Sequence, residues 1–555
     1  MAERKVAVQE VAVRAPGDTD ASTVKPVREL LLGDEAVAVA AIDAGISGGF
    51  SYPGTPATEI LETIQARTKN DPHIANAWSV NEKVAYEEAL GMSFMGKRAL
   101  VAMKHVGLNV AADPFINSAI TGAHGGLVLV VADDPGMHSS QNEQDSRYYG
   151  YFAQIPVFEP SNQQEAYDMT REAFEVSERF GLPVMVRVVT RLAHSRAAVT
   201  RSRPAEGHDV IRPVKETRDW TLLPVNARRR FRRLLDLQES LREYSVDSRY
   251  NVLQLRGPKG IIASGLAINY VEEVIGPAST CSLLKIGTYP APVAMIRELV
   301  SHCTEILVVE EGYPFIENQL IGLLGVPGKA IEGKRSGRLP PDGEMTADLV
   351  RLALGMAPLE TPPPVGGLPG RPPALCQGCP HCDTFKSLLE AVASETKPTL
   401  FSDIGCYTLG ALPPYNAVDS CVDMGSSISM ALGAAKAGAR PVICTIGDST
   451  FTHSGMTPLL GAIHQDADMT VIILDNATVG MTGGQEVFVT GEGFLRLLKG
   501  LGVNEEHLIL FEPLPKNHEK NVQILRQEIN HRGLSVLVAS RPCIHLKKKV
   551  VEQKA

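Results

Sequence analysis

Short apolar runs alternate with longer amphipathic stretches along most of the chain. This alternation is typical of parallel α/β proteins, in which a helix follows each buried strand and covers the sheet. Strands are expected at Trp78–Val80, Arg98–Met103, Leu127–Val131, Pro183–Val188, Gly260–Gly265 and Glu305–Gly312. The segment GGFSYP around Gly49 is expected to open a further strand-to-helix unit. The pattern therefore predicts an α/β architecture with parallel sheets.

Changes in composition divide this pattern into blocks. A chain of 555 residues is too long for a single core, so several domains are expected. We expect a first block at residues 26–200, a polar connecting segment at 201–250 and a second block at 251–345. A proline- and glycine-rich linker, TPPPVGGLPGRPPA at 361–374, precedes a last block at 375–545.

Charge and apolar content exclude several classes of protein. The net charge of −9 argues against general nucleic-acid binding. The N-terminus lacks the apolar core of a signal peptide, and no apolar run reaches the length of a membrane span. We therefore expect a cytoplasmic protein that is not in a membrane. Reducing conditions there disfavour disulfides, so clustering among the nine cysteines indicates metal or redox chemistry.

A polar pair follows two expected strands in the last block. Gly447-Asp448-Ser449 ends one strand, and Asn476 ends the next after 26 intervening residues. If the strands are adjacent and parallel, both side chains leave the same sheet edge about 5 Å apart, where α/β sheets bind ligands. A helix N-terminus near Ser454 is expected to face the same crevice. The carboxylate and the amide oxygen suit Mg²⁺, and Gly447 lets a phosphate approach the backbone closely. The alternative is an ordinary aspartate in a turn and an ordinary asparagine at the end of a strand.

The spacing of this pair resembles the thiamine diphosphate motif, Gly-Asp-Gly followed by Asn, with Ser449 in place of the last glycine. The resemblance implies that Gly447, Asp448 and Ser449 bind the cofactor. It also implies that Asp448, Asn476 and the backbone carbonyl of Thr478 ligate Mg²⁺, which anchors the diphosphate.

Thiamine chemistry also needs an apolar wedge that bends the cofactor and a carboxylate that activates its pyrimidine. The segment CVDMGSSISMALGAAKA resembles the family's helix entry and implies that Met424, beside Gly425, is the wedge. A core methionine is the alternative. Three acids, Glu82, Glu87 and Glu88, compete for the activating role. We select Glu82, because it opens a helix directly after an expected strand and can face the crevice; an ordinary acid in a first helical turn is the alternative.

Ordered segments in all three blocks extend the resemblance. They are SYPGTPATEI, NEKVAYE, MKHVGLNVAADP, ADDPGMHSSQNEQDSR, SDIGCYTLG, GDSTFTHSG and ILDNATVGMTGGQ. From about residue 28 to 545 the chain resembles the large subunit of the indolepyruvate ferredoxin oxidoreductases, in the 2-oxoacid:ferredoxin oxidoreductase superfamily. The resemblance implies a multidomain thiamine-diphosphate fold. Its pyrimidine-binding, transketolase C-terminal-like and diphosphate-binding domains would be the three blocks defined above.

The same resemblance assigns a purpose to clustered cysteines. It implies that four of them hold a proximal [4Fe–4S] cluster, namely Cys376, Cys379, Cys406 and Cys543. Cys382 departs from the family pattern and is expected to lie outside the cluster. The alternatives are a zinc site that uses the C-x2-C pair with Cys382 and His381, or a degenerate site. The remaining cysteines are expected in the core: Cys281, Cys303, Cys421 and Cys444.

Three polar residues are placed by motif near the reactive face of the cofactor. His453, Lys104 and His105 could bind a 2-oxoacid carboxylate or shuttle a proton, and a structural role is the alternative for each. The family's Met-Thr-Gly-His-Gln reads Met-Thr-Gly-Gly-Gln at 481–485. Loss of that histidine enlarges the pocket or removes a contact, so the substrate need not be indolepyruvate.

Two further segments give weaker signals. The run NARRRFRRLLDL at Asn226–Leu237 could bind the phosphates of coenzyme A or a partner protein, although such a run is more often a solvated helix face. The loop at 132–147 is rich in turn residues and hydrogen-bond acceptors, and we expect it to cover the active site.

The resemblance implies oxidative decarboxylation of a 2-oxoacid, with an aryl or branched one favoured, to an acyl-CoA. Thiamine diphosphate, Mg²⁺ and the [4Fe–4S] cluster are the expected cofactors, and coenzyme A is the expected cosubstrate. The family's ferredoxin-like module, with its C-x2-C-x2-C-x3-C-P runs, is not found in this sequence. We therefore expect a hetero-oligomer with a small catalytic subunit and electron transfer to ferredoxin or a cluster-bearing partner. A non-redox thiamine-dependent decarboxylase or carboligase is the alternative, and a non-catalytic scaffold subunit is a third hypothesis.

Overall fold

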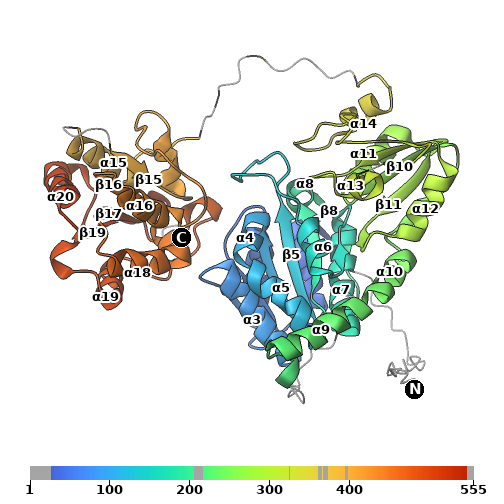
Figure 1. The fold of residues 1–555 in the computed structure, drawn as a ribbon, viewed down its shortest axis with the longest axis horizontal. Helices are drawn as coiled ribbons and strands as arrows, with labels where there is room; N and C mark the ends of the chain where they lie inside the picture. The colour runs from blue at the N-terminus through green and yellow to red at the C-terminus, as the bar shows by residue number, and fades with distance from the viewer. Residues whose placement is uncertain are drawn as a thin grey trace.

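The structure, a computed structural model, describes residues 27–205, 217–323, 325–359, 366, 370, 373–393 and 398–546. Within these residues the chain forms three mainly parallel sheets and one antiparallel pair of strands, so the predicted α/β class is confirmed. Figure 1 shows the N-terminal sheet in the middle, with the C-terminal sheet on one side and the 252–332 sheet on the other. Most of the linker predicted at 361–374 lies outside the described residues.

The N-terminal sheet has the strand order β12-β6-β7-β5-β4-β2-β3, and only β12 runs antiparallel to its neighbour. Its strands are β2 (Gly48–Ser51), β3 (Ala75–Trp78), β4 (Ala99–Lys104), β5 (Leu127–Asp133), β6 (Val157–Phe158), β7 (Val184–Val189) and β12 (Thr288–Tyr289). The helices of this block are α1 (Gly33–Asp43), α2 (Thr58–Thr68), α3 (Glu82–Phe94), α4 (His105–Val110), α5 (Ala112–Thr121), α6 (Arg147–Ala153), α7 (Gln163–Phe180) and α8 (Thr190–His194). A separate antiparallel pair, β1 (Arg28–Leu32) with β8 (Arg196–Thr200), joins the beginning of the block to its end.

The second sheet has the order β14-β13-β10-β11-β9, with β9 antiparallel. Its strands are β9 (Val252–Gln254), β10 (Lys259–Ser264), β11 (Ser282–Ile286), β13 (Glu305–Val309) and β14 (Ala330–Glu332). The helices here are α11 (Ala267–Ile275), α12 (Val293–His302), α13 (Phe315–Ile321) and α14 (Ala347–Ala353). Two helices, α9 (Pro224–Asp236) and α10 (Gln238–Asp247), connect the first sheet to the second.

The C-terminal sheet is entirely parallel, in the order β15-β16-β17-β19-β18. Its strands are β15 (Thr399–Phe401), β16 (Val442–Gly447), β17 (Met469–Asp475), β18 (Leu508–Phe511) and β19 (Leu534–Ser540). Its helices are α15 (Pro380–Ala391), α16 (Ser426–Lys436), α17 (Asp448–Thr450), α18 (Met456–His464), α19 (Glu492–Leu501) and α20 (His518–Asn530). Because β16 and β17 are neighbours with Gly447 opposite Leu474, the residues after them emerge at one edge of the sheet.

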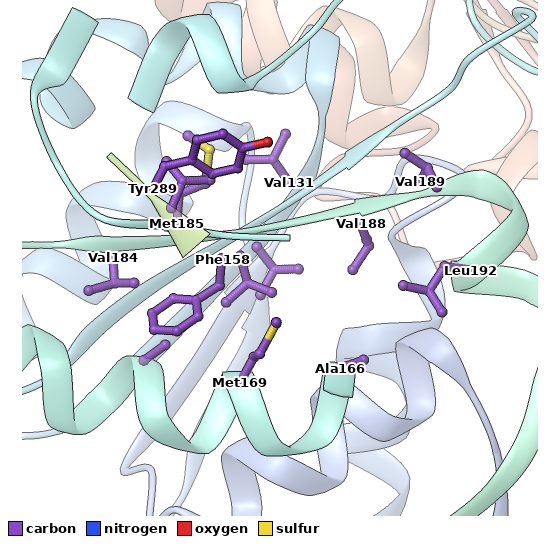
Figure 2. Packing of buried hydrophobic residues seen from close by; sticks show 14 of the residues in the cluster. Val131, Phe158, Ala166, Met169, Val184, Met185, Val188, Val189, Leu192 and Tyr289 are labelled. Atoms are coloured by element: carbon purple, nitrogen blue, oxygen red, sulfur yellow. The ribbon is translucent and has the colours of Figure 1, made fainter. Parts of the chain in front are cut away.

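Helix α7 shows how the spacing of apolar residues determines which face of a helix packs against the N-terminal sheet. The Asn162 side chain caps the helix by accepting from the Glu165 N–H at 2.9 Å, and Gly181 ends it with a φ of 62°. The buried positions recur every three or four residues, so one face of α7 lies against the sheet. In Figure 2, Met169 of this helix and Phe158 of β6 lie in the layer between helix and strands. Both side chains are fully buried.

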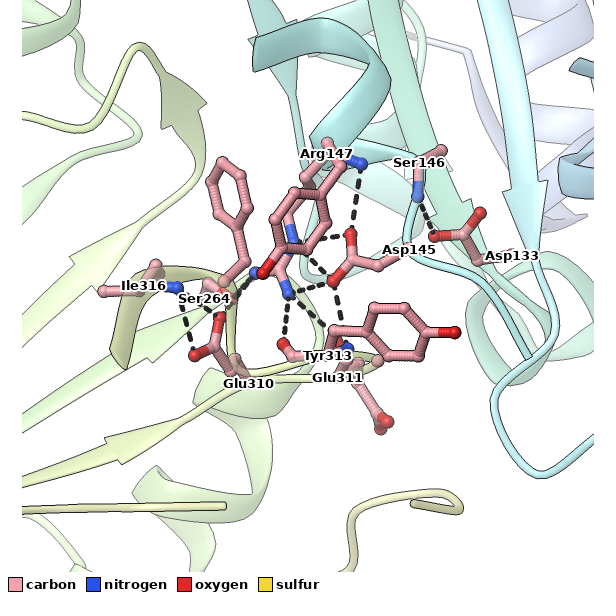
Figure 3. A network of polar contacts seen from close by, with 12 residues as sticks. Asp133, Asp145, Ser146, Arg147, Ser264, Glu310, Glu311, Tyr313 and Ile316 are labelled. Carbon is pink, nitrogen blue, oxygen red and sulfur yellow. Dashed lines mark hydrogen bonds and ion pairs between the residues drawn. The ribbon is translucent and has the colours of Figure 1, made fainter. Parts of the chain in front are cut away.

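A buried ionic network joins the first two sheets (Figure 3). Arg147 donates from Nε to Asp145 at 2.9 Å and contacts Glu310, after β13, at 2.9 Å. Arg187 on β7 pairs with Asp133 at 2.6 Å. Both arginines are almost completely buried, and so are all three acids. Because removal of one partner would leave buried charge uncompensated, the network fixes how these sheets pack.

The arginine-rich run forms most of α9. Its arginine side chains are mainly exposed, as expected of a solvated face, with two exceptions. Arg230 is buried and donates to the Ile120 carbonyl at 3.1 Å, and Arg233 donates to the Phe180 carbonyl at 3.0 Å. These two arginines therefore attach α9 to the N-terminal block.

Several local expectations are wrong. Strand β3 ends at Trp78, so the strand predicted at Trp78–Val80 begins and ends earlier. The helix expected near Ser454 begins directly at Asp448 and contains a π-helical turn at Phe451–Gly455. Cys303 and Cys444 are buried as expected, but two cysteines predicted in the core are not: Cys421 is exposed and Cys281 is half-buried. No helix in the described part of the chain is both long and apolar enough to cross a bilayer.

Candidate active site

A crevice runs between the carboxyl edges of the N-terminal and C-terminal sheets. With its open mouth it has a volume of about 960 Å³. Its walls include residues that follow β2, β3, β4 and β5 on one side and β15, β16 and β17 on the other. The predicted site residues that line it are Glu82, Lys104, Cys406, Met424, Gly447, Asp448, Ser449, Asn476 and Thr478. Such an edge is where α/β sheets bind ligands.

The polar pair predicted from spacing meets at this edge. The Asn476 backbone N–H donates to Asp448 Oδ2 at 3.2 Å, although the residues are 28 positions apart. One end of the Asn476 side-chain amide lies 3.2 Å from that same oxygen and 2.8 Å from the Thr478 carbonyl. With its nitrogen on this side, the amide donates to both groups. With its oxygen on this side, the amide oxygen, Asp448 Oδ2 and the Thr478 carbonyl oxygen face one point. Three oxygens are the kind of ligand set that Mg²⁺ prefers.

The surroundings of Asp448 also fit a bound cation. Burial, and secondarily the nearby Asp475, raises the pKa of Asp448 to about 8. A divalent ion would compensate this buried carboxylate. A Cβ at Gly447 would meet the Tyr407 ring at 2.6 Å, so no larger side chain fits where a diphosphate would approach the backbone.

The serine that replaces the motif's last glycine has a partner across the crevice. The Tyr52 hydroxyl and Ser449 Oγ are 2.7 Å apart, and they come from segments 397 positions apart. The Tyr52 ring also contacts His453 edge-on, with ring centroids 4.7 Å apart. Ser449 therefore helps to join the two halves of the site.

Of the three competing acids, only Glu82 reaches the crevice. It is 5% exposed, and its Oε2 accepts from His453 Nε2 at 2.8 Å. Asn81, the N-cap of α3, donates its side-chain amide to the His453 carbonyl at 3.0 Å. Glu87 is exposed and pairs with Lys83, while Glu88 accepts from Ser79. The structure thus brings Glu82 and His453 together from opposite sides of the crevice.

The other predicted residues have distinct surroundings. Met424 is half-buried at the crevice wall, next to Gly425, whose φ of 86° and close approach to Ser454 leave no room for a side chain. Lys104 lies at the wall, where its Nζ donates to the Ser139 carbonyl at 3.2 Å. Burial lowers the pKa of Lys104. His105 is not among the lining residues; it is buried, with Nε2 3.1 Å from the Asn142 carbonyl.

The four predicted cluster cysteines gather beside the diphosphate edge. Burial raises the pKa of the Cys406 thiol to about 11, with smaller contributions from the thiols of Cys543 and Cys376. Burial likewise raises the pKa of Cys379 to about 12, with smaller contributions from the thiols of Cys382 and Cys406. The Cys543 N–H donates to the Asn476 carbonyl at 2.8 Å. Segments more than 160 positions apart in the sequence therefore meet next to Asn476.

The zinc alternative does not match this geometry. Tetrahedral zinc holds thiolate sulfurs about 3.8 Å apart. In the described part of the chain, the one group of three or more metal-ligand atoms within 4.8 Å of one another lies in the N-terminal block, not here. Cys382 Sγ points to the Cys376 carbonyl at 3.7 Å, and His381 lines the crevice. The assignment of the four thiols to an iron–sulfur cluster stays a prediction.

Sequence reasoning missed two residues below the diphosphate edge. The buried Tyr407 hydroxyl donates to Asp403, which also accepts from Ser427 Oγ at 2.6 Å. Burial raises the pKa of Asp403 to about 7. In the segment SDIGCYT only the cysteine belongs to a motif, and the Asp and Tyr match no spacing rule. No signal in the sequence therefore identifies these two residues. The loop at 132–147 does contribute to the crevice, through Ser139 and Gln141.

Two family models match the chain. The model described as "Pyruvate flavodoxin/ferredoxin oxidoreductase, thiamine diP-bdg" matches residues 39–229. The model described as "Thiamine pyrophosphate enzyme, C-terminal TPP binding domain" matches residues 403–499. The first match includes Glu82, and the second includes Asp448 and Asn476. Fold, crevice and matches together define a thiamine diphosphate-dependent 2-oxoacid oxidoreductase.

Comparison with curated relatives identifies the family within this class of enzymes. The indolepyruvate oxidoreductase subunit IorA of Archaeoglobus fulgidus is 39% identical over 546 residues, which cover 92% of this chain and 86% of the relative. The IorA subunit of Pyrococcus abyssi is 36% identical, with 93% and 86% covered. A solved 2-oxoglutarate:ferredoxin oxidoreductase from Magnetococcus marinus aligns at 16% identity and a TM-score of 0.49, over 59% of this chain and 65% of that one. This chain belongs to the IorA family of indolepyruvate oxidoreductase subunits, as the large subunit of a 2-oxoacid oxidoreductase, and the predicted resemblance is confirmed.

Proposed function

We propose that this chain, together with a small catalytic subunit, converts an aryl or branched 2-oxoacid to its acyl-CoA and CO₂. The electrons leave singly through a [4Fe–4S] cluster held by Cys376, Cys379, Cys406 and Cys543. One observation carries the proposal: a buried carboxylate, an oxygen-rich diphosphate edge and a cysteine line the same crevice. Oxidative decarboxylation needs an acid–base group, a cofactor anchor and an electron exit in one place.

The residues divide the binding of thiamine diphosphate between the two walls. Asp448, Asn476 and the Thr478 carbonyl would hold Mg²⁺ and, through it, the diphosphate. When bound, the cofactor supplies a carbanion nucleophile and an electron sink. Glu82 would exchange the proton of the pyrimidine, and its contact with His453 at 2.8 Å keeps the carboxylate oriented.

Lys104 is the candidate for binding the substrate carboxylate, because it is a half-buried cation at the crevice wall. An aryl or branched side chain is supported by the apolar lining that Val479 and Met481 provide. The relatives' name, indolepyruvate oxidoreductase, points to an aryl substrate. Gly484 stands where the family's histidine is expected, which leaves room for a different aryl group.

The position of Cys406 supports the electron route. A Cβ at Gly480 would lie 3.2 Å from Cys406 Sγ and 3.9 Å from the Asn476 amide, so the thiol adjoins the diphosphate edge. Single-electron transfer at a useful rate needs a cluster within roughly 15 Å of the cofactor, and a cluster on this thiol would lie beside the diphosphate edge. Ferredoxin or a cluster-bearing partner would then accept the electrons. Coenzyme A would take the acyl group.

The test is anaerobic co-expression with a candidate small subunit, followed by reconstitution and a panel of 2-oxoacids. CO₂ release and reduction of a viologen dye are followed together. We expect brown protein with broad absorbance near 400 nm and coupled CO₂ release and dye reduction with one aryl or branched acid. Loss of dye reduction in Cys406→Ser, with Cys421→Ser as the exposed-cysteine control, would support the electron route. CO₂ release without dye reduction for every acid would instead indicate a non-redox decarboxylase.

A further inference from the structure

Three side chains outside the crevice converge in the N-terminal block. Asp34 lies in the first turn of α1, Glu59 lies in the first turn of α2, and His194 ends α8. One ligand atom from each lies within 4.8 Å of the other two. His194 Nε2 is 3.6 Å from Glu59 Oε1. Residues from three separate helices thus present two carboxylates and an imidazole to one point.

Three of the four carboxylate oxygens at this point lack a hydrogen-bond partner in the described structure. Asp34 is fully buried, and neither of its oxygens has a hydrogen-bond partner in the described structure. Glu59 Oε2 is also buried without one. Buried polar groups are almost always paired, because an unpaired one costs 1–3 kcal/mol or more. Burial, Glu59 and Glu35 together hold the pKa of Asp34 well above its usual range.

The surrounding charges do not supply the missing compensation. Among the described residues, neither Asp34 nor Glu59 has an ion pair with a lysine or arginine. Arg196 instead pairs with Glu35, the residue next to Asp34, at 3.8 Å. Asp134, the other charged group that acts on His194, is an acid. The site therefore combines one histidine–glutamate pair with three buried carboxylate oxygens that have no hydrogen-bond partner.

We propose that Asp34, Glu59 and His194 bind a divalent transition-metal ion of the Mn²⁺, Fe²⁺ or Zn²⁺ class. Two carboxylates with an imidazole suit these ions better than Mg²⁺ or Ca²⁺, which prefer oxygen ligands alone. The exposed side of His194 leaves room for water to complete the coordination. The ion would supply the missing partner of the three unpaired carboxylate oxygens.

Such an ion would brace the wall of the crevice. The loop before α2 contains Pro53 and Thr55, which line the crevice. At the start of α8, the Thr190 hydroxyl donates to Asp134 at 2.7 Å, and Asp134 in turn accepts from the Ser139 N–H at 2.8 Å. Ser139 also lines the crevice. A metal that ties α1, α2 and α8 together would therefore hold two crevice loops at a fixed separation.

Mn²⁺ is the probe, because it avoids the thiolates that would capture Zn²⁺ at the cysteines. The full chain is stripped with a chelator and saturated with Mg²⁺ and thiamine diphosphate, so that the diphosphate edge is filled. Loss of the six-line EPR signal of free Mn²⁺ then measures binding. We expect one further Mn²⁺ per chain, bound at least about tenfold more weakly in each of Asp34→Asn, Glu59→Gln and His194→Gln.

The control variants are Glu272→Gln and His464→Gln, which change exposed residues of the same types elsewhere. They should bind Mn²⁺ as the wild type does. Hydrogen exchange gives a local readout: Mn²⁺ should slow exchange at the starts of α1 and α2, and Asp34→Asn should abolish this effect. Absence of the extra Mn²⁺, or binding that all three variants leave unchanged, overturns the proposal. A rise in the unfolding temperature of metal-free Asp34→Asn with no Mn²⁺ effect would also overturn it, in favour of a shared proton between the carboxylates.

Discussion

Replacement of Glu82 by glutamine is the sharpest test of the catalytic arrangement. The two side chains have the same shape, and a glutamine can still form a hydrogen bond with His453, 2.8 Å away. Fold and cofactor binding should therefore survive. Only the capacity to exchange a proton is lost.

The size of the effect follows from the packing of this carboxylate. General acid–base groups contribute about 10²–10⁴-fold to rate, or about 3–5 kcal/mol of barrier. Glu82 is 5% exposed, and a Cβ at Gly107 would approach its Oε1 to 2.5 Å. Neither Glu87 nor Glu88 reaches the crevice to replace the carboxylate, so the loss should reach at least about 10³-fold.

Hydrogen–deuterium exchange at the thiazolium C2 of bound thiamine diphosphate, read by quenched-flow NMR, measures this step without knowledge of the substrate. Calorimetry on the same sample should show cofactor affinity within about threefold of the wild type. Glu87→Gln is the matched control, because that acid is exposed on the same helix and pairs with Lys83. Exchange in Glu82→Gln within tenfold of the wild type would refute the reasoning. So would a slow Glu87→Gln variant.

Three further predictions concern stability and the shape of the site. Burial raises the pKa of Glu311 from 4.5 to about 7, so ionisation of this side chain lowers the free energy of unfolding as the pH rises from about 5 to 7. In denaturant unfolding, the free energy of unfolding of Glu311→Gln should gain up to about 3 kcal/mol relative to the wild type between pH 5 and 8. A difference that does not change with pH would contradict this. Arg147→Met should lower the free energy of unfolding by about 3–5 kcal/mol, because the buried acids around Arg147 become uncompensated. The control, Arg229→Met, changes an exposed arginine and should lower it by less than about 1 kcal/mol. Equal losses in the two variants would rule out a special role for the buried network. Gly425→Ala should weaken cofactor binding at least about tenfold by calorimetry, since a Cβ there meets a side chain at 2.5 Å. Gly438→Ala has the same left-handed backbone with open space around it and should bind normally.

The alternation of apolar runs and helices was enough to predict parallel sheets, because strand length and helix period are local properties. The spacing from Asp448 to Asn476 was informative for the same reason. One helical segment and one strand fit between them, and a strand precedes Asp448, so neighbouring parallel strands must present both residues at one edge. Glu82 was distinguishable from Glu87 and Glu88 by its place at the start of a helix.

Local pattern failed where burial depends on distant partners. Both Cys421 and Cys444 were expected in the core, yet Cys421 is exposed, whereas Cys444 is buried because β16 lies inside the C-terminal sheet. The helix expected near Ser454 begins at Asp448 instead, directly after the strand. The Gly-Asp-Ser motif predicted the chemistry at this position, but it did not predict the turn from strand to helix at Asp448.

The sequence by itself determined the class of fold, the family and the residues at each sheet edge. Only the tertiary structure decided which edges face each other. The pairs Tyr52–Ser449 and Glu82–His453 join positions 397 and 371 residues apart, and the cluster of Asp34, Glu59 and His194 gathers three helices. No local periodicity encodes such contacts, because they depend on how whole sheets pack. Packing is a collective result of burial across the chain, so these partners emerge only in the folded molecule.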